Sequence, residues 1–253
     1  MLWHKAWRDT RWRFLIGLGL ITCTALVLVL IYPSVQGDFG LVLAAGPTGL
    51  LADHINHMTQ LSGTFRGYIW VQFISQNLFN LWIVFAVLLG AEAPFSRRRG
   101  AIFTLSLPVS RRRLYATRAA TDLAELGVLA LIPMLLIVLL APAVGQTYAL
   151  GDALVHVMHM FAGGAVFYCL TLLLSTVFDD RWKPIVITLA VAVIIVLCKW
   201  LIPALAPFSP AGVMAGERYF QTGTPAWAGL LVWLSVSAAM LYGAVRSIEL
   251  RDF

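Results

Sequence analysis

Two histidine pairs are the residues of this sequence whose type and spacing best suit metal binding. The pairs are His54 with His57 and His156 with His159, each with methionine close by. Imidazole nitrogen and thioether sulfur are ligands that soft transition metals favour. No cysteine or carboxylate cluster completes either pair, and no serine–histidine–acid or paired-carboxylate arrangement predicts catalysis. We therefore favour the simpler interpretation that these histidines form hydrogen bonds near a surface.

A stripe of amide side chains is a second polar feature. Gln72, Gln76 and Asn80 follow one another at intervals of four residues, which places them on one face of a helix. The sequence around them is apolar, and amides are unfavourable in contact with lipid. The stripe is therefore expected either to form hydrogen bonds between helices, within one subunit or between two, or to line a translocation path.

Residues 92–118 carry the densest group of charges. Two triple-arginine clusters flank a short apolar stretch: Arg97, Arg98 and Arg99 precede it, and Arg111, Arg112 and Arg113 follow it. The stretch, residues 101–107, is far too short to cross a bilayer. The arginines alone would keep the loop on the cytoplasmic side and contact anionic lipid. An ordered succession of arginines, apolar helix, Pro108 and arginines exceeds what a topology signal needs, and favours a docking surface for a soluble partner.

Acidic residues lie close to these arginines. Glu92 is expected to form an ion pair with one of the first three, either as a structural contact or as a latch between the preceding helix and the loop. Asp122 and Glu125 begin the next apolar run and are expected to pair with Arg118. Charges near a bilayer are costly unless they are paired, so each of these expectations requires a partner.

The composition places the chain in a membrane. Of its 253 residues, 60% are hydrophobic and only 12% are charged, whereas soluble domains carry about 25% charged residues. The net charge of +6 does not predict nucleic-acid binding, because the cations cluster beside apolar runs and form no aromatic-interleaved patch. The cysteines Cys23, Cys169 and Cys198 lie inside apolar runs and form no CxxC pair, as is typical of inert buried thiols.

Six apolar runs have about the ~20 residues that a membrane helix needs. They cover residues 14–32, 68–89, 123–140, 153–178, 184–205 and 227–245. The predicted fold is therefore all-α and polytopic, one transmembrane domain over residues 1–253. Residues 1–14 are expected to form an amphipathic helix in the membrane interface. The outer connection 33–67 suits short helices that cap the bundle, and the small residues of 162–165 predict close helix packing.

The distribution of lysines and arginines predicts the orientation. Fifteen of the eighteen fall on one side of the predicted spans, in the N-terminal segment, the 92–118 loop, the fourth-to-fifth connection and the C-terminus. Only Arg66, Lys199 and Arg218 fall on the other side. Basic residues are retained in the cytoplasm, so both termini are expected to be cytoplasmic, in a bacterial-type inner membrane.

The loop resembles the cytoplasmic loop of ABC-2 type transporter permeases. The resemblance rests on Glu92, then Gly100, the short apolar segment, and a turn with Leu107, Pro108 and a following arginine. It implies a permease subunit, an exporter, whose loop forms a coupling helix on a separate ATP-binding subunit. It also implies a second copy of the chain, or a related permease, as partner.

Nucleotide chemistry is expected only in such a companion. The chain has no GxxxxGK[ST] phosphate loop, and the nearest glycine cluster, residues 46–49, lacks the lysine. ATP and Mg²⁺ would therefore be bound by the partner, with no cofactor in this chain. Two other classes stay open: a membrane enzyme acting on lipid or an isoprenoid, and an ATP-independent channel or assembly factor. An ATP-binding partner in pull-downs from native membrane separates transport from both.

Overall fold

A computed structural model describes residues 2–45, 52–91, 111–178, 180–202 and 208–249. No strand occurs in these ranges, and they contain six helical segments long and apolar enough to cross a membrane. The predicted all-α, polytopic fold is therefore confirmed. The spans run Thr10–Gly37, Phe65–Gly90, Arg112–Val144, Leu150–Val177, Trp182–Lys199 and Trp227–Ser247.

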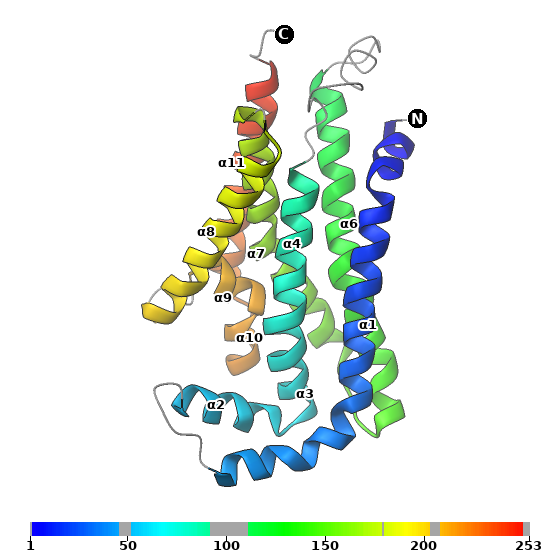
Figure 1. The fold of residues 1–253 in the computed structure, drawn as a ribbon, viewed down its shortest axis with the longest axis vertical. Helices are drawn as coiled ribbons and strands as arrows, with labels where there is room; N and C mark the ends of the chain where they lie inside the picture. The colour runs from blue at the N-terminus through cyan, green and yellow to red at the C-terminus, as the bar shows by residue number, and fades with distance from the viewer. Residues whose placement is uncertain (1, 46–51, 92–110, 179, 203–207, 250–253) are drawn as a thin grey trace.

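The described elements follow one another as a bundle of long helices with short helices at one end (Figure 1). They are α1 (Leu2–Ala45), α2 (Ala52–Ser62), α3 (Phe65–Tyr68), η1 (Ile69–Leu78), α4 (Phe79–Gly90), α6 (Arg111–Leu140), η2 (Ala141–Val144), α7 (Leu150–Val177), α8 (Trp182–Leu201), α9 (Pro210–Ala215), α10 (Glu217–Thr222) and α11 (Trp227–Glu249). The start of α1 and the end of α11 lie at the same end of the bundle, as an even number of crossings requires.

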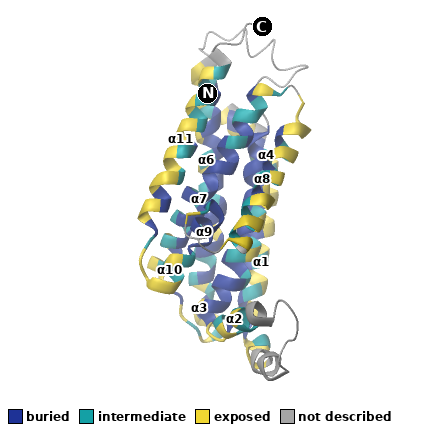
Figure 2. Cartoon of the chain, turned by 90° about the vertical axis from the view of Figure 1, so that its left-hand side faces the viewer, coloured by how far each residue is buried: buried dark blue, intermediate teal, exposed yellow. Residues whose placement is uncertain are grey.

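The helix α7 forms the centre of the bundle. It packs against α4, α6, α8, α9 and α11. Of its most apolar stretch 67% is buried, compared with 17% for the span formed by α8. Figure 2 shows buried residues along α4, α6 and α7, and exposed residues on the outer faces of α8 and α11. Those faces carry large apolar side chains such as Val193, Leu197 and Leu231, as expected of helices that face lipid rather than water.

Small residues in α7 allow the central helices to approach closely. A Cβ atom added to Gly164 would lie 2.3 Å from the indole ring of Trp82 in α4. One added to Gly163 would lie 2.8 Å from Met214 in α9. The close packing predicted for residues 162–165 is confirmed, because each of these glycines faces a different neighbour.

The second span departs from regular α-helix. Residues Ile69–Leu78 form η1, a π-helix of 10 residues between α3 and α4. π-Helical stretches are rare and are frequently found at functional sites. The sequence predicts the span, but it does not predict the wider turns of a π-helix within it.

The two ends of the bundle are built differently. After Pro33, which cannot donate a helical hydrogen bond, α1 runs on to Ala45 and its last part lies across the end of the bundle beside α2 (Figure 1). The end of α1 and the short helix α2 thus occupy the described part of the predicted outer connection, residues 33–67. At the opposite end α6 begins at Arg111, well before the apolar run begins at 123, so its first turns carry arginines together with the buried Tyr115 and Ala119.

The contact between Gly164 and Trp82 gives a prediction for stability. Gly164→Ala should lower the free energy of unfolding by about 1–3 kcal/mol, because the fully buried indole cannot move away without strain. The matched control is Gly19→Ala, where an added Cβ meets nothing within 4 Å. Unfolding in mixed detergent micelles measures both. Equal stability of the two variants would contradict the described packing.

Candidate functional site

Two clusters of polar side chains lie toward opposite ends of the bundle. The first, here called the acid cluster, consists of Thr10, Arg118, Asp122, Glu125 and Tyr168. The second, the histidine cluster, consists of Arg66, Asp152, His156, His159 and Tyr219. The helix α7 contributes to both, so it connects them along the length of the bundle.

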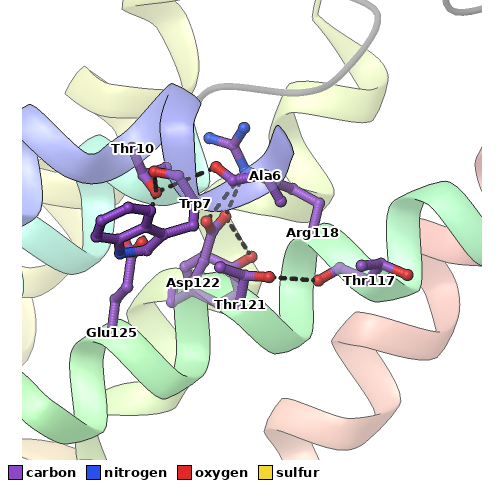
Figure 3. A network of polar contacts seen from close by, with 9 residues as sticks. Ala6, Trp7, Thr10, Thr117, Arg118, Thr121, Asp122 and Glu125 are labelled. Carbon is purple, nitrogen blue, oxygen red and sulfur yellow. Dashed lines mark hydrogen bonds and ion pairs between the residues drawn. The ribbon is translucent and has the colours of Figure 1, made fainter. Parts of the chain in front are cut away.

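In the acid cluster, the start of α6 lies beside the start of α1, as Figure 3 shows, and is also joined to α7. The Arg118 guanidinium donates through Nε to both carboxylate oxygens of Asp122, at 3.0 and 3.1 Å. The Tyr168 hydroxyl of α7 donates to Asp122 Oδ2 at 3.1 Å. Spacing of four residues on one helix makes the first contact local, whereas Tyr168 lies in a different helix.

Glu125 joins the same part of α6 to the start of α1. The Thr10 hydroxyl lies 2.5 Å from Glu125 Oε1. The second carboxyl oxygen, Oε2, is buried and has no hydrogen-bond partner among the described residues. The predicted pairing of Arg118 is therefore confirmed for Asp122, while Glu125 contacts Thr10 instead.

The histidine cluster joins three helices, α3, α7 and α10, at the other end of the bundle from the acid cluster. Arg66 Nε of α3 lies 3.1 Å from Asp152 Oδ2 in the first turn of α7. The Tyr219 hydroxyl of α10 donates to Asp152 Oδ1 at 2.6 Å. This hydrogen bond, together with burial, raises the pKa of Tyr219, so the phenol keeps its proton and remains a donor. The guanidinium of Arg66 also lies over the rings of Tyr219 and Phe220.

The two histidines of α7 differ in their contacts. His159 donates through Nδ1 to the Val155 carbonyl at 2.8 Å, and its Nε2 accepts from the Ala226 N–H at 3.2 Å. His156 is 1% exposed, and neither of its ring nitrogens has a hydrogen-bond partner among the described residues, so the expected hydrogen bonding near a surface is wrong for this histidine. A glycine is required beside it, because Gly216 has φ +61° and an added Cβ would lie 2.8 Å from His156 Nδ1.

This geometry limits what the predicted metal candidates can do. Both nitrogens of His159 are used by the protein, so none is left for a metal ion. His57 is exposed on α2, and the side chain of His54 lies outside the described residues. Within the part of the chain that the structure describes, no three histidine, cysteine or acidic side chains are grouped as metal ligands.

The amide stripe lies on the π-helical part of the second span. Gln72 and Gln76 belong to η1, and Asn80 follows in the first turn of α4. Gln76 and Asn80 are exposed on the single chain, and Gln72 is half-buried. The Asn77 side chain donates through Nδ2 to the backbone carbonyl of Gln72 at 2.6 Å, five residues earlier. The stripe therefore points out of the subunit rather than into its core.

Most of the predicted docking loop lies outside the described residues. These positions are Glu92, Arg97, Arg98, Arg99, Gly100, Leu107 and Pro108. Of the remaining members, Arg111 begins α6, and the side chains of Arg112 and Arg113 are exposed. Arg118, Asp122 and Glu125 of the acid cluster follow these arginines in α6, so the loop leads along the chain into that cluster.

Two contacts between distant residues of these clusters were not predicted from the sequence. Thr10 and Glu125 are 115 residues apart, and Arg66 and Asp152 are 86 residues apart. The available signal was the presence of ionisable residues at the edges of apolar runs, each of which needs a partner.

Comparisons with protein-family models, curated proteins and solved structures gave no match.

The ion pair between Arg118 and Asp122 gives a prediction for stability. Asp122→Asn should lower the free energy of unfolding by about 3 kcal/mol, because it removes the charge that balances a buried guanidinium. Asp180→Asn, at an exposed position where the amide oxygen can still accept from the Trp182 N–H, is the matched control and should change it by less than about 0.5 kcal/mol. Detergent unfolding followed by circular dichroism gives both values. If Asp122→Asn were as mild as the control, the ion pair would not be part of the folded core.

Proposed function

We propose that this chain is the membrane-spanning permease subunit of an ATP-driven transporter of the ABC-2 type, with the direction of an exporter. The observation that carries the proposal is the order of features in residues 92–118: an acid, three arginines, a glycine, a short apolar segment, a Leu-Pro turn and three more arginines. This order resembles the loop on which such permeases receive their ATP-binding subunit.

The architecture supports the proposal in two ways. Six candidate spans agree with the number that the resemblance implies. The end of α4 and the start of α6, which the loop connects, lie at the same end of the bundle as both termini (Figure 1). The basic residues of the loop and termini would then face the cytoplasm together, in an inner membrane of bacterial type.

Energy would come from the companion and not from this chain. The companion would bind ATP and Mg²⁺, and its closure on ATP would move the docked loop. A ligand shifts such an equilibrium only by its different affinity for the two states, so the loop must be bound differently in each. The arginines provide a charged surface that an acidic groove would recognise.

Charge reversal in the loop tests this proposal. Replacing Arg111, Arg112 and Arg113 by glutamate should reduce co-purification of an ATP-binding protein by about tenfold or more, because like charges across an interface cost several kcal/mol. The triple lysine variant, which keeps the charge, is the control. Protease mapping must show that the loop stays on the same side in both. Normal co-purification with the reversed charges would refute docking at this site.

The amide stripe supports a second permease copy as a partner. Gln76 and Asn80 are exposed within a membrane span, where contact with lipid would leave their donors and acceptors unpaired. An amide is both donor and acceptor, so the same stripe on a second copy is complementary to it. Two copies would also enclose a larger path than six helices can.

A double substitution measures this contact. Gln76→Leu with Asn80→Leu should weaken the dimer by about tenfold, since hydrogen bonds between membrane helices contribute about 0.6 to 1.7 kcal/mol each. The measurement is energy transfer between labelled copies in liposomes at increasing dilution. Gln60→Leu, on the exposed side of α2, serves as the control. Unchanged association would show that the dimer contact lies elsewhere.

A further inference from the structure

One stretch of α6, from Tyr115 to Leu126, is hydrogen-bonded to three other long helices. Asp122 accepts from Tyr168 of α7, and Glu125 contacts Thr10 of α1. The Leu126 carbonyl accepts from the indole N–H of Trp82 in α4, at 3.0 Å. The Tyr115 hydroxyl adds a longer contact, 3.4 Å, to the Leu172 carbonyl of α7. We call this stretch the α6 junction.

The junction is buried and closely packed. Asp122, Tyr168, Thr10, Trp82 and Leu126 are all 0% exposed, and Glu125 is 5% exposed. Side chains in such surroundings occupy fixed rotamers, and each hydrogen bond would leave an unpaired group in an apolar interior if its helices separated. The four helices therefore behave as one body at this level of the bundle.

The position of the junction in the chain gives it a role. It begins four residues after Arg111, where α6 starts at the end of the docking loop. The loop joins α4 to α6 along the chain, so a displacement of the loop reaches these two helices before it reaches α7, which packs against both. The hydrogen bond from Tyr168 to Asp122 is the side-chain contact that ties these two helices together at the acid cluster.

The far end of α7 leads to the short helices. Asp152, in its first turn, holds Tyr219 of α10 and Arg66 of α3. The Trp70 indole donates to the Ala215 carbonyl of α9 at 2.8 Å, and the Trp70 ring stacks on Phe220 at 4.5 Å. Because α7 itself packs against α9 and holds α10 through Asp152, a shift of α7 would be transmitted to both short helices, which Trp70 of η1 joins to the second span as well.

We infer that the α6 junction carries loop movement into α7 and from there to α9 and α10, with Tyr168 as the positioning residue that couples the two long helices. This inference rests on the proposed function, because the companion supplies the movement. It adds that the third and fourth spans, rather than the second span alone, transmit it.

The test uses the complex purified with its ATP-binding companion in nanodiscs. Backbone amide exchange of residues 210–222 is measured with and without Mg·ATP in the wild type, in Tyr168→Phe and in the control Tyr242→Phe. Tyr242 is an exposed tyrosine of α11, so both changes remove only a hydroxyl. We expect Mg·ATP to change the exchange rate about tenfold in the wild type and control, within the usual range of coupling between sites. In Tyr168→Phe the change should fall below about twofold.

A second pair of variants tests the contact with α1. Thr10→Val removes the hydroxyl that meets Glu125, while Thr24→Val removes one that bonds only within its own helix. Thr10→Val should also reduce the response to Mg·ATP, and Thr24→Val should not. Each response is a ratio within one variant, and companion binding and ATP hydrolysis are recorded in parallel. A general loss of stability would not selectively remove the response.

The outcomes separate the inference from the proposed function. If no ATP-binding companion co-purifies with the wild type, the proposed function fails and the inference fails with it. If the companion binds and hydrolyses ATP but residues 210–222 respond equally in Tyr168→Phe and the control, the inference alone is overturned. The same conclusion follows if the wild-type complex shows no response there. Selective loss in Tyr168→Phe and Thr10→Val supports the junction.

Discussion

The absence of water in the hydrocarbon layer is the constraint on which this structure depends. An unpaired polar group in that layer costs several kcal/mol, so pairing of the polar groups inside the spans stabilises the fold. Exceptions among the described residues include the ring nitrogens of His156 and Oε2 of Glu125. Asp122 meets Arg118 and Tyr168, Glu125 meets Thr10, and Trp82 meets a backbone carbonyl. These contacts join helices that hydrophobic packing alone would leave free to slide, because lipid is as apolar as their side chains.

Close approach of the helices makes those contacts possible. Gly164 brings α7 against the indole of Trp82, and Gly90 brings the end of α4 within reach of the Tyr168 backbone, where an added Cβ would lie 2.8 Å from the carbonyl oxygen. The helices α4 and α7 lie close together, and α6 packs against both of them. The small residues and the buried polar residues thus belong to one arrangement: the first set the spacing, and the second fix the register.

The fold could be predicted from the sequence, because twenty-residue apolar runs have one stable form in a bilayer. Local pairs such as Arg118 with Asp122 could also be predicted, since their spacing on one helix brings them together. The partners of Glu125 and Asp152 could not, because they depend on which faces of distant helices meet. The π-helix in residues 69–78 was not predicted either, because its residues are ordinary helix and strand formers and their types do not distinguish the wider turn of a π-helix from the turn of an α-helix.

That wider turn has a consequence for how this segment tolerates insertions and deletions. An α-helix advances about 100° per residue, so removing one residue normally rotates everything beyond it to a new face. A π-helical stretch already contains surplus backbone, and losing one residue there would return part of it to α-helix while α4 kept its orientation against α7. Homologues of different length through residues 69–78 would therefore still share the same core, and sequence alignments of this span need a gap at that place.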